Sequence, residues 1–191
     1  NSFCTLLGAV MNPAVHSDGA APAGEEDQVM VASVQLTELE MLSANPAYFT
    51  DRVQWRMRVE ALEALPEPVT VAFYWVGSVK SSDHDQLLDE FDIGPLTVGV
   101  NEVVLEHEPP QIGLIPADEL FELTGLYIVL SYRGEAFLRV GYWAKVAFWD
   151  NETMLNPPAQ LDLSLIGRNV LMERPIVTTY PVDWEAFAKA A

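Results

Sequence analysis

The chain has 191 residues, half of them hydrophobic, and its 28 acidic and 10 basic residues give a formal net charge of -18. This size predicts one ordinary domain whose core needs neither metal nor disulfide. The charge argues against direct binding of nucleic acid and favours a basic partner, although an acidic balance also serves solubility alone. The single cysteine, Cys4, excludes an intrachain disulfide, and no apolar run of 18 residues predicts a membrane span.

The first part of the chain reads as a flexible extension over residues 1–29. Phe3 to Met11 is apolar and precedes Ala20-Ala21-Pro22-Ala23-Gly24, a pattern that also fits the end of a secretory signal. A signal needs a basic flank, which this segment lacks. We therefore expect an extension over 1–29, one domain over 30–185 and a short chain end over 186–191.

From Val34 onward, apolar residues alternate with a period of two. Residues 52–60 are the clearest case, with apolar side chains on one face and arginines on the other, which predicts a strand with one wet face. Residues 69–76 are continuously apolar, which predicts a central strand covered on both sides. Turn residues separate further strands expected at 98–106, 123–132, 136–148 and 176–182. Many short antiparallel strands predict an all-β sandwich.

Two segments, 82–90 and 162–172, have the apolar spacing of short helices. The first turns Leu87, Leu88 and Phe91 towards the protein, and the second turns Leu163, Ile166, Val170 and Leu171 the same way. On the first helix Asp85 and Asp89 would share one face, because they are four residues apart. That carboxylate pair is either a site for a cation or an ordinary solvated face.

The segment 132–143 predicts a tight antiparallel hairpin, with the turn at Arg133-Gly134-Glu135 between two alternating runs. Side chains alternate across a strand, so Arg139, Gly141 and Trp143 share one face while Val140 and Tyr142 take the other. A cation beside a small residue and an exposed indole predicts a contact surface.

Motifs for chemistry are missing from the sequence. It contains no Gly-rich phosphate loop, Cys-x-x-Cys, His-Glu-x-x-His or Gly-x-Ser-x-Gly, and its histidines are scattered. The one suggestive cluster is Asp83-His84-Asp85, whose adjacent side chains cannot all converge on one atom. We expect no enzyme activity, no cofactor and no metal. A hydrolase built on that cluster remains an alternative, as does a generic immunoglobulin-like binding module, which glycan on the Asn151-Glu152-Thr153 sequon would favour.

An ordered set of short motifs resembles the anti-silencing function one histone chaperones. The spacing is nearly free of gaps between residues 34 and 184. The motifs are Trp75-Val76-Gly77-Ser78, Asp85-Gln86-Leu87-Leu88-Asp89, Gly94-Pro95, Gly113-Leu114-Ile115-Pro116, Tyr132-Arg133-Gly134, Phe137-Leu138-Arg139-Val140-Gly141-Tyr142, Asn156-Pro157-Pro158, Arg168-Asn169-Val170-Leu171 and Trp184.

The resemblance implies an immunoglobulin-like β-sandwich with short helices in its connections. It also implies a monomeric histone chaperone of the nucleus, with a cytoplasmic pool, that acts without a cofactor. Its partners would be the dimer of histones three and four and the larger histone-deposition chaperones, with no direct nucleic acid and no membrane. The expected activity is to shield the tetramerisation surface of that dimer and to hand it over for nucleosome assembly and disassembly.

The resemblance also places a histone-binding surface on this chain. Its expected residues are Asp85, Glu119, Leu123, Gly125, Tyr127, Arg139, Tyr142, Trp143 and Val177. Two departures bear on it, because Gly125 stands where the family has valine and Lys80 stands where it has an acid. Tyr127 and Trp143 are expected to fill the space that the glycine leaves. The alternative is that these aromatic side chains belong to the core.

A second surface, on the opposite side, would receive basic hairpins from the deposition chaperones. The resemblance places it at Glu67, Asp89 and Ile93, with Pro68 replacing a neighbouring acid. The family also lets the tail of histone four add a strand along the last strand, here residues 176–180. Ile176 replaces the family's arginine there, which matters little where pairing is through the main chain.

Overall fold

The computed structural model describes residues 33–121, 123–184 and 187, so the extension expected over 1–29 and most of the chain end lie outside the described residues. The described chain is nearly all β. Its strands are β1 (Val34–Met41), β2 (Ala47–Tyr48), β3 (Val53–Ala61), β4 (Val69–Val76), β5 (Gln86–Ile93), β6 (Gly99–His107), β7 (Leu123–Tyr132), β8 (Glu135–Phe148), β9 (Ile166–Val170) and β10 (Ile176–Thr179). Its short helices are α1 (Asn151–Leu155) and the 3₁₀ turns η1 (Ser82–His84), η2 (Ile112–Leu114) and η3 (Leu163–Leu165).

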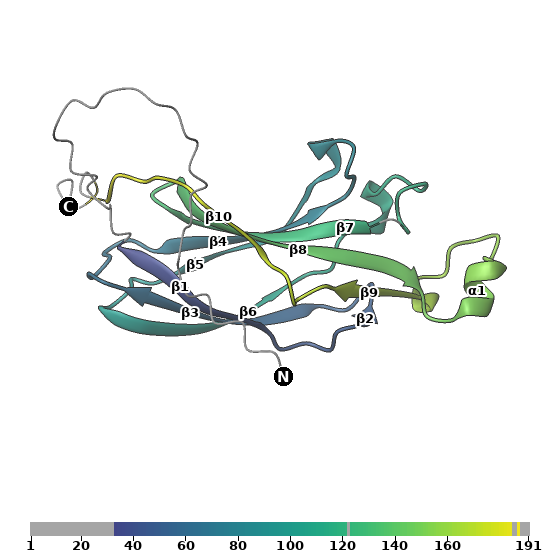
Figure 1. Cartoon of the computed structure of the whole chain (residues 1–191), viewed down its shortest axis with the longest axis horizontal. Helices are drawn as coiled ribbons and strands as arrows, with labels where there is room; N and C mark the ends of the chain where they lie inside the picture. Colours follow the sequence, from purple (N-terminus) through teal and green to yellow (C-terminus); the bar gives the residue numbers. More distant parts are fainter. Residues whose placement is uncertain (1–32, 122, 185–186, 188–191) are drawn as a thin grey trace, which may run out of the picture.

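The strands form two sheets that pack face to face (Figure 1). The smaller sheet has the order β1-β3-β6, and the larger has the order β2-β9-β8-β7-β4-β5, with β10 also paired to β8. Neighbouring strands pair antiparallel throughout. The predicted all-β, immunoglobulin-like sandwich is confirmed, and the strands predicted at 123–132 and 136–148 match β7 and β8 closely.

The core between the sheets follows from the alternation of side chains. On β3, Val53, Trp55, Met57 and Val59 are buried and face the larger sheet. Trp55 stacks on Tyr142 of β8 at a ring-centroid distance of 5.7 Å. Each such side chain contributes about 1.5–3 kcal/mol through burial. This core fixes the position of β7 and β8, which carry the expected contact residues on their other face.

Among the buried polar residues of the described chain, His107 and Arg168 carry titratable side chains. His107 is 1% exposed, with its Nδ1 2.8 Å from the Glu108 carbonyl and its ring 4.8 Å from that of Phe73. Burial lowers its pKa to about 4, so the ring is neutral at pH 7. Arg168 donates hydrogen bonds to the carbonyls of Phe49 and Asp51, at 2.9 and 2.6 Å, and burial lowers its pKa to about 10.

The prediction for residues 69–76 is only partly correct. β4 is central, since it lies between β7 and β5, and its inward side chains are buried. On the outer face, however, Tyr74 and Val76 are only half-buried. A sheet that is covered on one side needs apolar residues on that face alone. Core packing therefore does not explain why the outer face of β4 is apolar.

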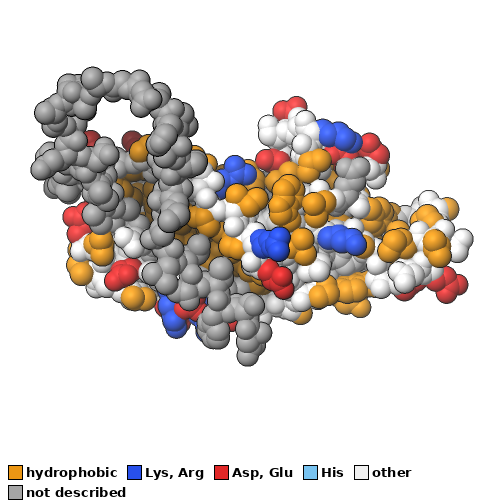
Figure 2. Space-filling model, viewed as in Figure 1, with side chains coloured by type: hydrophobic (Ala, Val, Ile, Leu, Met, Phe, Trp, Pro, Cys, Tyr) orange, Lys and Arg blue, Asp and Glu red, His pale blue; other side chains and the backbone are white. Residues whose placement is uncertain are grey.

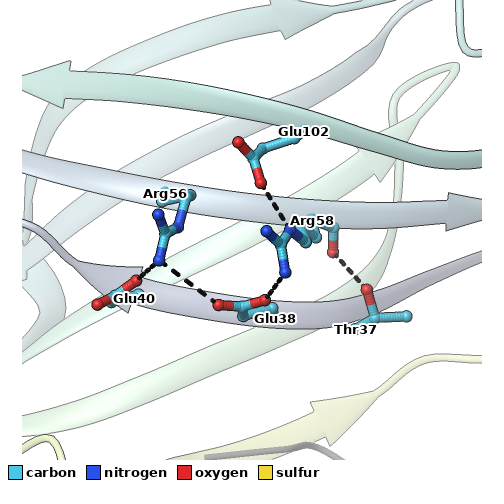
Figure 3. Close-up of polar contacts among 6 residues, drawn as sticks. All are labelled: Thr37, Glu38, Glu40, Arg56, Arg58 and Glu102. Atoms are coloured by element: carbon cyan, nitrogen blue, oxygen red, sulfur yellow. Dashed lines mark hydrogen bonds and ion pairs between the residues drawn. The ribbon is translucent and has the colours of Figure 1, made fainter. Parts of the chain in front are cut away.

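The wet face predicted for residues 52–60 is confirmed, and it carries a row of ion pairs (Figure 3). Arg58 lies 2.5 Å from Glu38 on β1 and 2.6 Å from Glu102 on β6. Arg56 lies 3.8 Å from Glu38 and also pairs with Glu40. The arginines of the middle strand are thus neutralised by carboxylates on both neighbouring strands.

The two helix predictions were wrong. Residues 82–84 form a single 3₁₀ turn capped by Ser81, and the chain then runs into β5. Residues 163–165 form another such turn before β9. Leu87, expected to face the protein, is 53% exposed. Apolar spacing over so few residues fits a helix or a strand equally. Here the segments form strands, because β5 pairs with β4 and β9 pairs with β8. Within the described chain, none of the helices is long and apolar enough to cross a membrane.

Candidate functional site

The outer face of β7 and β8 carries the central residues of the expected contact surface. Leu123, Gly125 and Tyr127 point away from the core, as the alternation predicted. The pairing register sets Gly125 opposite Trp143 and Tyr127 opposite Gly141. Because β4 is the other neighbour of β7, Gly125 also lies opposite Val76, and Tyr127 opposite Tyr74.

The turn between these strands starts their pairing, and a one-residue register shift between Leu130 and Ser131 then sets this register. Tyr132 pairs with Glu135 across a two-residue turn in which Arg133 and Gly134 have φ values of 50° and 81°. Positive φ at both turn residues matches the twist of antiparallel strands. The hairpin predicted at Arg133-Gly134-Glu135 is therefore confirmed, and it sets Arg139, Gly141 and Trp143 on the outer face.

Tyr127 is held by three neighbours. Its ring stacks on that of Tyr74, with centroids 4.8 Å apart and planes 10° apart. The Arg139 guanidinium carbon lies 3.9 Å from the Tyr127 ring centroid, which is a close cation–π contact. The phenol donates a 3.3 Å hydrogen bond to Oδ2 of Asp85. Burial, followed by the Asp85 charge, raises the pKa of Tyr127 to about 12, so this donor keeps its proton at neutral pH.

Asp85 reaches this face from the 3₁₀ turn η1. Its amide donates to the Ser82 carbonyl at 3.0 Å, which closes the turn. Its second carboxylate oxygen, Oδ1, is buried and accepts no hydrogen bond from the described residues. A buried oxygen without a donor is costly. Because Oδ1 is shielded from solvent, a partner's donor could reach it only after a local rearrangement.

The centre of the face is apolar and open. Leu123 and Trp143 are 48% and 43% exposed, and within the described chain the Trp143 ring stacks on no other ring. Gly125 has no side chain, which leaves a shallow notch in this row of side chains. The notch is narrow at its base, since a Cβ there would lie 3.3 Å from Cγ2 of Val76 and 3.4 Å from the Tyr142 carbonyl oxygen. Trp143 is therefore a surface residue rather than a core aromatic. Tyr127 does not fill the notch from above, because Tyr74 and Arg139 engage its ring.

Glu119 lies at the margin of this face but is already engaged. Its carboxylate accepts a 2.6 Å hydrogen bond from Ser78 and lies 3.3 Å from the Lys80 ammonium. The Ser78 hydrogen bond and then Lys80 lower the pKa of Glu119. Lys80, which stands where an acid was expected, thus offsets the charge of this flanking acid.

The structure places Tyr142 and Val177 apart from that centre. Tyr142 is 5% exposed and faces the core, where it stacks on Trp55, so its side chain is not part of the surface. Val177 is on β10, paired with Val140 of β8, and is exposed. It lies beside the outer face along the edge of the sheet.

A comparison with protein families matches residues 31–185 to the ASF1 like histone chaperone model. The chain belongs to this family. Among relatives, it is 40% identical over 152 residues to "Histone chaperone ASF1" of Saccharomyces cerevisiae, covering 80% of this chain and 54% of that protein. It is 34% identical over 154 residues to "Histone chaperone asf1" of Dictyostelium discoideum, covering 81% and 99% respectively. The chain thus spans about half the length of the yeast relative but nearly all of the Dictyostelium one.

The second surface expected from the ASF1 like family lies along β4 and β5. Glu67 precedes β4 and forms a 2.9 Å ion pair with Arg133 of the hairpin turn. Ile93 pairs with Val69 and is buried at 8% exposure, and Asp89 lies opposite the inward-facing Phe73. Asp85 and Asp89 therefore share no helix face, since Asp85 contacts Tyr127 on the outer side of the sheet.

The cluster Asp83-His84-Asp85 lies in and just after η1. Asp85 turns to Tyr127, while Asp83 is exposed at the N-terminal end of the turn. Among the described residues, no group of three His, Cys, Asp or Glu side chains is arranged to hold a metal ion.

Sequence reasoning missed Tyr74. It sits in the continuous apolar run of β4, where every residue looks like core. The available signal was alternation from the buried Phe73 and Trp75, which sends Tyr74 to the outer face beside Tyr127. The half-buried outer face of β4 thus supplies the ring against which Tyr127 stacks.

Proposed function

We propose that this chain is a histone chaperone that binds the dimer of histones three and four. It shields the tetramerisation surface of that dimer and hands it over for nucleosome assembly and disassembly. The family and the names of the relatives support the chaperone role. The observation that carries the binding surface is the joining of Asp85, Tyr127 and Arg139 beside the open apolar centre at Trp143.

The chemistry of this surface suits a helix with an apolar stripe and charged flanks. Leu123 and Trp143 supply exposed apolar area, and an aromatic side chain with an arginine is the usual composition of a binding hot spot. Arg139 forms no ion pair with the described residues, so its charge is available to a partner's carboxylate. Asp85, which is half-buried and bonded to Tyr127, offers the opposite charge. The chaperone would act by covering a surface, with no catalysis.

A second contact to the same dimer would form at β10. All four of its residues are exposed, and in the described chain it pairs with β8 alone. Its outer edge therefore presents main-chain groups to which an extended segment can add as a strand. We assign this edge, with Val177, to the tail of histone four.

Docking of larger deposition chaperones is proposed for the surface with Glu67, Asp89 and Ile93. β5 is the last strand in its sheet order, so its outer edge is open to a hairpin. The Glu67 charge is shared with Arg133, and Ile93 is mostly buried, so Asp89 carries most of the side-chain attraction. We further propose that the protein acts as a monomer in the nucleus, with a cytoplasmic pool.

Gel filtration with histones three and four, and separately with histones two A and two B, tests the proposal. The salt should be about 0.5 M, where loose charge attraction is largely screened. Selective co-elution with histones three and four is expected. Equal binding of both pairs would mean that the protein acts only as a polyanion. Binding of neither pair would mean that it is a binding module for other proteins.

Gly125→Val tests whether the notch is used. A valine adds apolar area at the centre of the face worth about 1 kcal/mol, and its Cβ requires Val76 to move by only a few tenths of an ångström. Binding should tighten a few-fold, with Gly125→Ala intermediate. Weaker binding by a folded valine variant would mean that a partner side chain already occupies the notch.

A further inference from the structure

A second exposed apolar surface lies at the end of the sandwich that carries α1, on the right of Figure 1. Tyr48 of β2 and Trp149, just after β8, meet edge to face with ring centroids 5.2 Å apart. The Trp149 indole lies directly on β9, because a Cβ on Gly167 would come within 2.8 Å of it. The Trp149 amide also donates to the Leu165 carbonyl at 3.0 Å. Both aromatic residues are fixed, yet 50% and 43% exposed.

The short helix α1 extends this surface. Asp150 caps it, accepting from the amide and the hydroxyl of Thr153, each at 2.7 Å. Met154 and Leu155 are thereby presented to solvent, and Leu155 is 80% exposed. Figure 2 shows hydrophobic side chains gathered over this end. We define the α1 patch as Tyr48, Trp149, Met154, Leu155 and Leu161. Single exposed apolar residues are ordinary, but several gathered at one end of a domain indicate a candidate interaction site.

Unpaired carboxylates surround the α1 patch. Asp51, Asp150, Glu152 and Asp162 are all exposed, and none forms an ion pair with the described residues. Residues 149–167 contain no lysine or arginine. Hydrogen bonds from Thr153 and Ser164 lower the pKa values of Asp150 and Asp162, so both are charged at neutral pH. The rim is therefore negative. The buried Arg168 attracts the Asp51 carboxylate, while Asp150, Glu152 and Asp162 form no ion pair with a cation of the described chain.

We propose that the α1 patch docks a basic amphipathic segment of another protein. The apolar side chains of that segment would cover Trp149 and Leu155, and its lysines or arginines would meet the carboxylates of the rim. A second copy of this chain fits worse, because it would bring an identical negative rim and a net charge of -18. Trp149 is six residues beyond Trp143, roughly 20 Å along an extended chain, so this site is distinct from the proposed histone surface.

Nuclear magnetic resonance of the tryptophan indole N–H groups can test this directly. The five tryptophans divide into Trp55, Trp75 and Trp184, which are buried, and Trp143 and Trp149, which report on the two exposed surfaces. The probe is a synthetic helical peptide of leucine and lysine with leucine on one face. We expect it to shift the Trp149 signal saturably and to leave the three buried indoles unchanged. The Trp149→Phe variant lacks this indole, so the signal that it loses is assigned to Trp149.

Two control peptides separate docking from charge attraction. One replaces lysine with glutamate and the other replaces leucine with glycine, and neither should shift Trp149. An equal shift with the leucine-free peptide would overturn the proposal, as would a shift of Trp143 alone. Trp149 shifts that depend on protein concentration, without peptide, would identify a second copy as the occupant and also overturn it.

Substitution completes the test. Leu155→Glu should weaken the peptide's effect on Trp149 about tenfold, because it puts a charge in the apolar contact of a residue that supports no core packing. Val100→Glu, also at an exposed apolar residue but on β6, is the matched control and should change nothing. Equal effects of the two variants would refute the site. Gel filtration with histones three and four reports on the Trp143 face, so the two proposals can fail separately.

Discussion

Arginines on the two outer faces of this sandwich have opposite surroundings. Arg56 and Arg58 on β3 are paired with glutamates of the neighbouring strands (Figure 3), and Arg52, just before β3, pairs with Glu106 of β6. On β8, Arg139 lies over the Tyr127 ring and forms no ion pair with the described residues. The first set of charges is neutralised within the fold.

The difference shows which face is available to a charged partner. A partner of the β3 face would have to displace carboxylates already held at 2.5–2.6 Å from Arg58. A partner of the β8 face meets an arginine that has no counter-ion among the described residues. Residue type alone does not reveal this, because both strands carry arginine on a polar face.

The largest expected effect concerns His107. Because its ring is buried between the sheets, the folded protein, and with it both faces, should lose stability in acid. Its pKa is about 4 when folded and about 6.5 when unfolded, so the unfolded state binds the proton more tightly. The contribution of neutral His107 to the free energy of unfolding is fully present above pH 6.5. It is lost as the pH falls towards 4, which lowers the free energy of unfolding by about 3 kcal/mol. Urea unfolding at pH 7 and pH 4.5 should show a smaller loss for His107→Phe. An equal loss would assign the acid sensitivity to carboxylates.

Arg139→Glu follows in size and tests the open face. Inverting this charge should weaken binding of histones three and four by about 1.4 kcal/mol or more, a factor of ten, with an unchanged melting temperature. Isothermal titration calorimetry measures it. Arg52→Glu, a charge reversal on the paired face, is the control and should bind normally. Unchanged affinity for Arg139→Glu would remove this residue from the surface.

Tyr127→Phe sharpens the account of the open face. It removes the 3.3 Å hydrogen bond to Asp85 while keeping the ring between Tyr74 and Arg139. We expect a loss of about 1 kcal/mol in stability, because Asp85 loses its phenolic donor. Chemical denaturation measures this, and Tyr74→Phe, which keeps its ring and has no such bond, is the matched control. No difference between the two variants would mean that the hydrogen bond is unimportant.

Arg58→Ala should have the smallest effect. Exposed ion pairs are screened and contribute little, so the melting temperature should fall by only about 1 °C, and less at 1 M salt. Histone affinity should not change. A binding defect comparable to that of Arg139→Glu would abolish the distinction between the faces.

Much of the fold was predictable because the strands with one wet face alternate. The alternating runs predicted the positions of β3, β7 and β8 and the face on which Arg139 and Trp143 lie. The turn at Arg133-Gly134 predicted that β7 pairs with β8, but not the register shift between Leu130 and Ser131. The errors fell where alternation is weak. β9 is short, and the pairing of β5 contains a register shift opposite Phe73 and Tyr74, so their apolar residues imitate a helical spacing.

The sequence by itself determined the sandwich class, the hairpin and the family, because these depend on local periodicity and ordered motifs. Only the tertiary structure decided which charges remain available. Arg58 and Arg139 look alike along the chain, and their difference lies in Glu38 and Glu102, 20 and 44 residues from Arg58, and in Tyr127. Likewise, Tyr48 and Trp149 become one apolar surface only because β2 and β9 pair beneath them. Contacts between residues so distant in sequence leave no local pattern to read.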